Sequence, residues 1–360
     1  MHTISSILAD WYKLHQRPLP WRETNDAYAI WVSEVVLQQT RVDQGMEYYL
    51  RFMDRWPDVR ALADAEEDEV LKMWQGLGYY SRARNLLSGA RQVMQNFNGV
   101  VPERYEKLKT IKGIGAYTAA AVASIAFNEP VAVVDGNVAR VIARLFAIEQ
   151  PVNTPVGQRM ILEVAEELLD RKNPGLHNQA LMEFGALVCL PRNPQCHNCV
   201  LNHLCEARRL DKQKDLPLKA NRKIIRDRWF NYLVINIQQN DKPPVLVVAK
   251  RNYDDIWKGM YEFPLIESKS KLNAEQLQAL ARPLLDALGH WQPLGVYHAA
   301  PHQLTHQRIM ASFFEFNLKA AVDFNLPNGL SLANAEQFRA KPLPKLIETY
   351  LNNNSTQRID

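Results

Sequence analysis

One acidic residue near the start of the chain has surroundings that suit acid catalysis. Residues 28–40 read YAIWVSEVVLQQT, a mostly apolar stretch that predicts a helix with Glu34 as its single acid. Three of its four neighbours one helical turn away are apolar, so its pKa should rise until it can donate a proton near neutral pH. The alternative is a glutamate that reaches solvent or pairs with Arg22 or Arg41. The glutamines that follow in the same segment favour a site.

A second acid, Asp135, follows an apolar run and precedes an amphipathic helix that we expect over residues 138–145. An aspartate in this place is either a helix N-cap or a carboxylate positioned in a site. It should stay ionised, because the helix dipole favours negative charge at an N-terminus. The two acids therefore have environments that favour opposite protonation states.

Between the two acids lies a glycine turn that could grip phosphate. Gly113 and Gly115 flank one isoleucine, after a basic segment that ends at Lys112 and before a helix of small residues expected over 116–126. Glycine tolerates positive φ and close backbone approach, so the turn can join two helices tightly. The first amides of the second helix lack intrahelical partners and lie at the positive end of its dipole, where they suit a phosphate oxygen. A simple interhelical turn is the alternative.

All four cysteines of the chain lie within seventeen residues, in the spacing Cys-x6-Cys-x2-Cys-x5-Cys. They are Cys189, Cys196, Cys199 and Cys205. We expect a metal site here, since a large chain that looks intracellular has little use for disulfides and thiolates select zinc or iron-sulfur clusters. Zinc is the general expectation for a Cys-x2-Cys unit.

We expect the chain to be helical up to the cysteines, so that helices position these residues. Apolar periodicity predicts further helices at 4–14, 44–55, 66–75, 86–95, 155–170 and 178–188. The glycine turn at 76–80 presents a leucine and two tyrosines beside arginines, a mixture that suits wedging into a base stack. The alternative is a turn whose tyrosines pack inward.

Composition sets broad limits. A chain of 360 residues with 47% hydrophobic and 23% charged residues is typical of a globular protein with two domains. Neither a membrane span nor a signal peptide is expected, so the protein is predicted to be cytoplasmic, and nucleoid-associated if bacterial. The net charge of +4 is only weakly suggestive of nucleic acid binding.

Taken together, these segments resemble the MutY-type adenine DNA glycosylases of the helix-hairpin-helix superfamily, over essentially the first 210 residues. The segments that carry the resemblance are LPWR (19–22), WVSEVVLQQTRV (31–42), GLGYYSRARN (76–85), GIGAYTAAAV (113–122), VDGNVARV (134–141) and the cysteine loop. The resemblance implies a [4Fe-4S] cluster in place of zinc, because the six-two-five cysteine spacing is that of endonuclease III and MutY. Bifunctional relatives carry a lysine where this chain has Tyr117, so a monofunctional glycosylase is implied.

The resemblance also assigns roles to residues. Glu34 would protonate the purine N7, and Asp135 would stabilise the oxocarbenium-like sugar, with Tyr117 helping to hold the site. Arg22 and Gln179 would bind the flipped adenine, although some relatives have Glu at the position of Gln179. The residues that would invade the duplex and contact the opposite base are Gln39, Leu77 and Tyr79. The DNA backbone would contact Lys112, Gly113 and Gly115.

After the cysteines the composition changes. Residues 208–228 predict a charged, solvated connector, and strands are expected at 232–237, 245–249, 260–263, 294–298 and 309–316, with helices at 274–288 and 343–351. This part resembles the Nudix-like, MutT-like domain of the same family, without the acidic signature of active Nudix hydrolases. In that family a Phe-Ser-His loop reads 8-oxoguanine. Here the loop is Leu304-Thr305-His306, which keeps a hydroxyl and loses an aromatic ring.

The sequence thus predicts a mainly α helix-hairpin-helix glycosylase domain with an iron-sulfur loop (1–207), a linker (208–228) and an α+β Nudix-like lesion-recognition domain (229–360). The expected activity is monofunctional removal of adenine opposite 8-oxoguanine or guanine in double-stranded DNA, by a monomer. Two alternatives remain: a bifunctional thymine-glycol-type endonuclease, and a noncatalytic, metal-stapled DNA-binding module.

Overall fold

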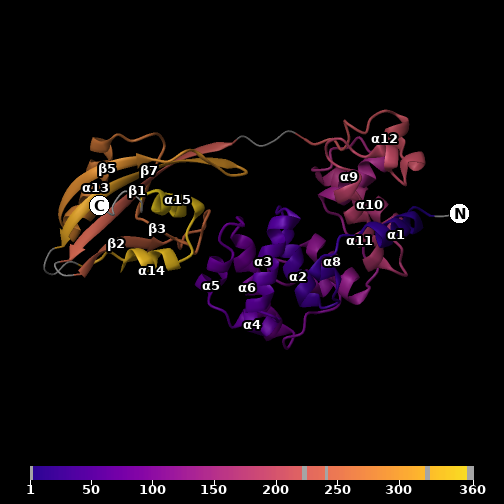
Figure 1. Cartoon of the computed structure of the whole chain (residues 1–360), viewed down its shortest axis with the longest axis horizontal. Helices are drawn as coiled ribbons and strands as arrows, with labels where there is room; N and C mark the ends of the chain where they lie inside the picture. Colours follow the sequence, from indigo (N-terminus) through magenta and orange to yellow (C-terminus); the bar gives the residue numbers. More distant parts are fainter. Residues whose placement is uncertain (1–2, 221–224, 240–241, 321–324, 355–360) are drawn as a thin grey trace. The chain divides into compact units, whose positions relative to one another are not determined.

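The computed structural model describes residues 3–220, 225–239, 242–320 and 325–354, and its chain divides into two compact units (Figure 1). The first unit comprises Met1–Ala65 and Asn85–Arg222, and the second comprises Glu66–Arg84 and Lys223–Asp360. The second unit is therefore discontinuous in sequence. The domain limits at 207/208 and 228/229 stay predictions.

Helices build the first unit, and no strand occurs among its described residues. Its α-helices are α1 (Ile4–His15), α2 (Ala27–Leu37), α3 (Val42–Arg55), α4 (Val59–Ala63), most of α6 (Ser81–Asn96), α7 (Tyr105–Leu108), α8 (Ala116–Phe127), α9 (Gly136–Leu145), α10 (Pro155–Leu168), α11 (Pro174–Leu187) and α12 (Glu206–Arg209). Three 3₁₀ turns complete it: η1 (Pro20–Arg22), η2 (Cys196–Asn198) and η3 (Asn202–Leu204).

Two apolar helices, α2 and α8, pack against each other in this unit. Residues 27–36 of α2 are all buried, and α8 offers a run of small residues that lets the two backbones approach. A second core is formed by α1, α9, α10 and α11, and it includes Leu201 of the cysteine loop. These two groups of packed helices fix the positions of the segments that carry Glu34, Asp135 and the cysteines.

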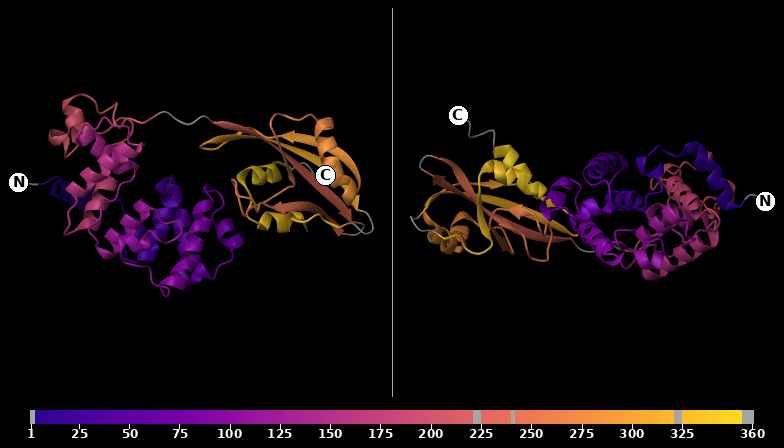
Figure 2. Two further views of the ribbon diagram at one scale, coloured as in Figure 1. Left: turned by 180° about the vertical axis from the view of Figure 1, so that it is seen from behind. Right: turned by 90° about the horizontal axis from the view of Figure 1, so that it is seen from below.

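The second unit begins with α5 (Glu67–Met73) and otherwise consists of a mixed sheet with helices. Its strands are β1 (Arg226–Gln239), β2 (Lys242–Lys250), β3 (Tyr261–Glu262), β4 (Leu265–Ser268), β5 (Gly289–His298), β6 (His302–Gln303), β7 (Gln307–Ala320) and β8 (Leu330–Ala333). The sheet runs in the order β3-β2-β1-β7-β5, with β1 and β7 parallel and every other pair antiparallel. Figure 2 shows this sheet and its helices from two further sides. Its helices are α13 (Ala274–Leu288), α14 (Ala335–Ala340) and α15 (Lys345–Asn354).

Alternation along the central strands gives this sheet two buried faces. Leu233 of β1 and Phe314 of β7 pack with α13 on one face. The preceding residue of β7, Phe313, stacks on Tyr350 of α15 on the other face, at 4.1 Å between ring centroids. The second unit is therefore a sheet between helices, as the predicted Nudix-like domain requires.

The structure corrects the limits of several expected elements. Helix α2 ends at Leu37, so the glutamines after it lie in a turn. Strand β1 begins at Arg226, inside the predicted connector, because Arg228 is buried and paired with Asp255 and Glu267. Residues 208–220 are also not all solvated: Leu216 is buried and its carbonyl accepts a hydrogen bond from Arg144.

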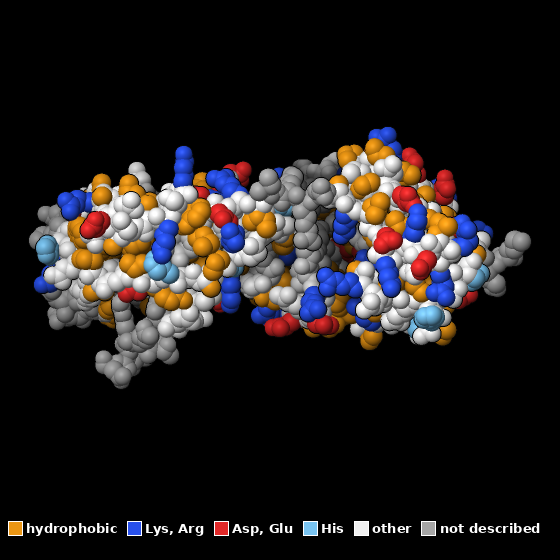
Figure 3. Space-filling view, turned by 90° about the horizontal axis from the view of Figure 1, so that it is seen from above, with side chains coloured by type: hydrophobic (Ala, Val, Ile, Leu, Met, Phe, Trp, Pro, Cys, Tyr) orange, Lys and Arg blue, Asp and Glu red, His pale blue; other side chains and the backbone are white. Residues whose placement is uncertain are grey.

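Within the described ranges, no helix combines the length and the apolar character that crossing a membrane requires. Lys and Arg side chains are scattered over the face shown in Figure 3, among apolar and acidic ones, in keeping with the modest net charge of +4.

Candidate active site

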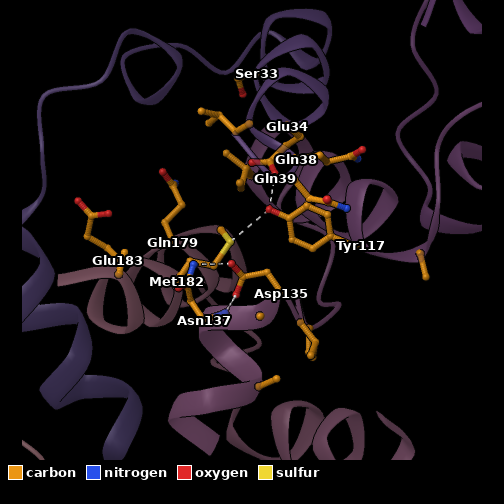
Figure 4. A pocket seen from close by; sticks show the side chains of 18 of the residues that line it. Ser33, Glu34, Gln38, Gln39, Tyr117, Asp135, Asn137, Gln179, Met182 and Glu183 are labelled. Carbon is orange, nitrogen blue, oxygen red and sulfur yellow. Dashed lines mark hydrogen bonds between the residues drawn. The ribbon is translucent and has the colours of Figure 1, made fainter. Parts of the chain in front are cut away.

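The predicted catalytic residues meet in one cavity of the first unit. It has a volume of about 1000 Å³, at the upper end of the range for ligand pockets, and is lined by residues from η1, α2, α8, α9, α10 and α11. Six predicted residues line it: Arg22, Glu34, Gln39, Tyr117, Asp135 and Gln179. All of these except Arg22 are labelled in Figure 4. The fold therefore brings these six residues to one cavity, beside other polar residues that the sequence did not single out.

Glu34 is held in the wall of this cavity at 8% exposure. Tyr117 Oη donates a hydrogen bond to Glu34 Oε2 (Figure 4). Burial raises the pKa of Glu34 to about 7, against the hydrogen bond from Tyr117, which favours the charged form. The negative charge of Asp135 adds to the rise. The expected proton donor near neutral pH thus has the electrostatic environment it needs.

Asp135 is the N-cap of α9 and also lines the cavity. The two interpretations of this residue, a helix cap and a carboxylate positioned in a site, are therefore compatible. Its Oδ1 accepts from the amides of Asn137, at 2.8 Å, and Val138, at 2.7 Å, and its Oδ2 accepts from Asn137 Nδ2 at 2.7 Å. Burial raises the pKa of Asp135, and these N–H donors oppose the rise because they favour the carboxylate.

Arg22 is fixed by a carboxylate that the sequence analysis did not single out. Glu183, on α11, is 1% exposed and accepts hydrogen bonds from Arg22 and Arg17, with Nη2···Oε2 distances of 2.8 and 2.6 Å. Although burial alone would raise it, these guanidinium groups hold the pKa of Glu183 at about 2. The sequence signal was present: Glu183 is the single acid in an apolar helix, as Glu34 is in its own.

The two predicted glutamines lie at different depths. Gln179 is half-buried, and its Oε1 accepts from Tyr12 Oη at 3.2 Å. Gln39 is exposed and has a φ of 57°, in the turn after α2. Its side chain is therefore the more accessible of the two to a macromolecule.

The glycine turn joins α7 and α8 as expected. Gly113 has a φ of 84°, and a Cβ there would lie 2.6 Å from Asn85 Cβ, so only glycine fits. Gln92 accepts from the Lys112 amide at 2.9 Å and donates to the Thr110 carbonyl at 2.9 Å, which fixes the turn. Gly115 is the N-cap of α8, is exposed and has no atom within 4 Å of a Cβ position, which leaves room for a phosphate.

The remaining predicted contact residues belong to the second unit. Leu77 is 8% exposed and Tyr79 is 44% exposed. Tyr79 Oη and Thr305 Oγ1 share a hydrogen bond of 2.5 Å. Thr305 and His306 are exposed, whereas Leu304 is half-buried, in the loop between β6 and β7. The structure thus joins the 76–80 loop to the 304–306 loop.

The four cysteines lie around η2 and η3, all partly buried and without disulfides. Arg144 of α9 donates to Cys189 Sγ at 3.3 Å and to the Leu190 carbonyl at 2.7 Å. Burial raises the pKa of Cys199 to about 11, and the other three thiols add to the rise. Four cysteines in one short loop, with a guanidinium beside Cys189, fit an iron-sulfur cluster, whose iron would bind all four as thiolates.

Helix α9 connects this loop to the acid Asp135. Arg140 donates to Asn137 Oδ1 at 2.8 Å and to the Cys189 carbonyl at 2.7 Å, while Asn137 donates to Asp135. The cysteine loop therefore supports one side of the cavity through two side chains.

Known protein families match three parts of the chain. Residues 32–168 match the HhH-GPD superfamily of base excision DNA repair proteins, and residues 232–353 match the NUDIX domain. Residues 189–205 match the iron-sulfur binding domain of endonuclease III. The predicted cofactor, a [4Fe-4S] cluster, and the predicted fold class are thereby confirmed.

Individual relatives carry a more specific name. The adenine DNA glycosylase of Rattus norvegicus is 35% identical, over 83% of this chain and 68% of its own length. That of Buchnera aphidicola subsp. Acyrthosiphon pisum is 27% identical, over 98% of this chain and 99% of its own. Among solved structures, a thermostable thymine-DNA glycosylase is 30% identical with a TM-score of 0.53, over 57% of this chain and 95% of that one.

Proposed function

Because the chain belongs to the adenine DNA glycosylases of base excision repair, we propose that it removes adenine mispaired with 8-oxoguanine or guanine in duplex DNA, without cleaving the strand. The observation that carries the proposal is the cavity in which Glu34, with a pKa of about 7, faces the carboxylate of Asp135. Cleavage of a glycosidic bond needs both a proton donor and a group that stabilises positive charge on the sugar.

In this mechanism the adenine leaves the duplex and enters the cavity, at a cost of about a few kcal/mol that the invading residues offset. Arg22, held by Glu183, and Gln179 orient the base. Glu34 donates its proton to the purine N7, which weakens the glycosidic bond. Asp135, whose carboxylate form is favoured by its three N–H donors against the effect of burial, stabilises the oxocarbenium-like sugar.

The absence of strand cleavage follows from the residue that borders Glu34. A lyase step needs an amine that attacks the sugar, and this chain has Tyr117 at that place. Among the described residues, those that line the cavity include no lysine. Both observations support a monofunctional enzyme over the thymine-glycol-type endonuclease.

Recognition of the opposite base is assigned to the second unit. Tyr79 and Thr305 present two hydroxyl groups joined by a hydrogen bond on an exposed surface, and such groups can read the edge of an oxidised guanine. The Nudix-like domain thus serves as a lesion reader in this proposal. Since one chain supplies every residue of the cavity, we also propose that the protein acts as a monomer.

Strand cleavage of a duplex with one adenine opposite 8-oxoguanine tests the proposal, beside a control duplex with adenine opposite thymine. We expect breaks in the mispaired duplex after hot alkali only. Breaks without alkali would establish a lyase and revive the endonuclease alternative. No breaks at all, in protein that retains its cluster, would favour a noncatalytic DNA-binding module.

A further inference from the structure

Helix α5 and the loop after it carry Leu77 and Tyr79, yet they belong to the same compact unit as residues 223–360. The chain reaches this segment more than 150 positions before the Nudix-like domain begins. Something must therefore fix the segment against strands to which it is not adjacent in sequence. Charged side chains at the two ends of the segment make most of these contacts.

Asp68 is the centre of these contacts. Its Oδ1 accepts from Lys250 Nζ of β2 at 2.7 Å, and its Oδ2 accepts from Tyr261 Oη of β3 at 2.9 Å. Lys341 Nζ lies 3.6 Å from Oδ2. Asp68 is 29% exposed and Lys250 is 32% exposed, so water screens the pair only in part. One carboxylate thus joins α5 to three separate places in the second unit.

Backbone contacts continue this connection along α5. Lys72 Nζ donates to the Arg339 carbonyl at 2.7 Å and to the Lys341 carbonyl at 3.2 Å. Gln75 Oε1 accepts from the amide of Leu343 at 3.2 Å. Because these partners are backbone atoms, the contacts that fix α5 do not depend on which side chains residues 339, 341 and 343 carry.

A close approach on the loop before β3 completes the contact. Gly259 has a φ of 83°, and a Cβ there would lie 2.8 Å from Glu67 Oε1 and 3.0 Å from Leu71 Cδ1. Arg84 Nη1 donates to the neighbouring Lys258 carbonyl at 2.5 Å. The segment 66–84 is therefore held at both of its ends.

The loop between those ends is itself stiff. Trp74 Nε1 donates to the Gly78 carbonyl at 3.2 Å, and Arg82 lies over the rings of Trp74 and Tyr79. A shift of α5 would consequently move Tyr79 as part of one body. It would change the hydrogen bond between Tyr79 and Thr305, which joins this loop to the 304–306 loop.

We propose that Asp68 is a positioning residue for lesion recognition: its contacts with Lys250, Tyr261 and Lys341 set the register between the 76–80 loop and the 304–306 loop. This inference rests on the proposed function of those two loops. Loss of the Asp68 charge should lower the preference for adenine opposite 8-oxoguanine over adenine opposite guanine. The removal of adenine opposite guanine should fall less, since the cavity of the first unit is not involved.

The test is the ratio of single-turnover rates on these two duplexes, measured for the full cluster-loaded protein and for Asp68→Asn. We expect a loss in the ratio of about fivefold, the size typical of partly exposed charge contacts. Lys250→Gln should lower the ratio in the same direction, and Asp68→Glu should restore part of it. Asp10→Asn, which removes an exposed ion pair with Lys13 in α1, is the matched control and should leave the ratio unchanged.

Hydrogen exchange of the amides at 76–80, without DNA, reports the same contacts independently of activity. Faster exchange in Asp68→Asn and Lys250→Gln, together with the lower ratio, supports the inference. An unchanged ratio in both variants overturns it, whatever the exchange rates. If the wild type itself shows no preference for 8-oxoguanine, the proposed function of the loops is wrong. In that case, unchanged hydrogen exchange in Asp68→Asn and Lys250→Gln would also exclude the positioning role of Asp68.

Discussion

The hydroxyl of Tyr117 donates a hydrogen bond to the carboxylate of Glu34, so the residue at the place of a lyase lysine tunes the acid. This hydrogen bond lowers the pKa of Glu34, while burial raises it to about 7. Tyr117 thus keeps the acid from becoming too weak to give up its proton. In the proposed mechanism, Glu34 supplies the proton near neutral pH, and Tyr117 stands where a lyase would carry an amine.

The activity should therefore depend on pH through Glu34. Only the protonated acid donates, so single-turnover excision should fall about tenfold per pH unit above pH 7. Excision should also fall at acidic pH, where Asp135 loses the charge that stabilises the sugar, and burial raises the pKa of Asp135. In Tyr117→Phe the hydrogen bond is lost, the pKa of Glu34 rises, and the decline should move to higher pH. Tyr28→Phe, which loses a buried hydrogen bond to the Trp56 carbonyl, should not move it. An unmoved decline in Tyr117→Phe would contradict the role of this hydroxyl.

The same raised pKa predicts a stability effect. The pKa of Glu34 is higher in the folded state than its ordinary 4.5, so its contribution to stability is complete below about pH 4.5 and is lost as pH rises through 7. At pH 8 the charged form costs about 3 kcal/mol. Glu34→Gln should therefore unfold at a higher temperature than the wild type at pH 8, with a smaller gap at pH 5. It should also lose excision. A gap that does not depend on pH would refute the assignment.

Asp135 allows its capping role to be separated from its catalytic role. Asp135→Asn keeps an oxygen that accepts from the Asn137 and Val138 amides, so α9 should lose about 1 kcal/mol or less. The negative charge is lost, and excision should fall about a hundredfold or more. Asp58→Asn, at the N-cap of α4, changes the same group at a residue that does not line this cavity. Equal excision rates in the two variants would reduce Asp135 to a cap.

Much of this fold is visible in the sequence because its signals are local. The expected helix at 274–288 has the same limits as α13, since an asparagine cap and a capping box mark its start and Gly289 follows its end. Glu34 could be found because one charge in an apolar helix breaks the pattern. Asp135 could be found because it stands between an apolar run and a helix.

Features that depend on distant partners gave no such signal. Arg228 reads as part of a charged connector, and partners from other segments, among them Asp255 and Glu267, make its burial in β1 possible. Asp68 reads as one of several acids at a helix start, and its lysine partner stands 182 positions away. Periodicity cannot report a contact of that kind, so the union of 66–84 with the C-terminal domain emerges only from the structure.

Glu183 gives a last prediction, because it is the partner that holds Arg22. Glu183→Gln leaves two guanidinium groups without their carboxylate, and we expect a loss of about 3 kcal/mol, near the lower limit for a broken buried pair because Arg17 is 34% exposed. Since the pKa of Glu183 is about 2 when folded and 4.5 when unfolded, this stability is present above pH 4.5 and is lost only as pH falls towards 2. The deficit of the variant should thus be the same at pH 8 and pH 5, whereas the stability gain of Glu34→Gln should differ between these two pH values.

Binding separates this structural effect from a role in base recognition. With Arg22 released, Glu183→Gln should bind a duplex that carries a non-cleavable adenine analogue at least about tenfold more weakly, the factor that corresponds to one lost charge-assisted hydrogen bond. Its affinity for the same duplex with an abasic site should change little, because that site offers no base for Arg22 to hold. Titrations of both duplexes at one salt concentration make the comparison, since phosphate contacts depend on salt. Equal losses on the two duplexes would mean that Glu183 supports the fold alone and that Arg22 does not bind the base.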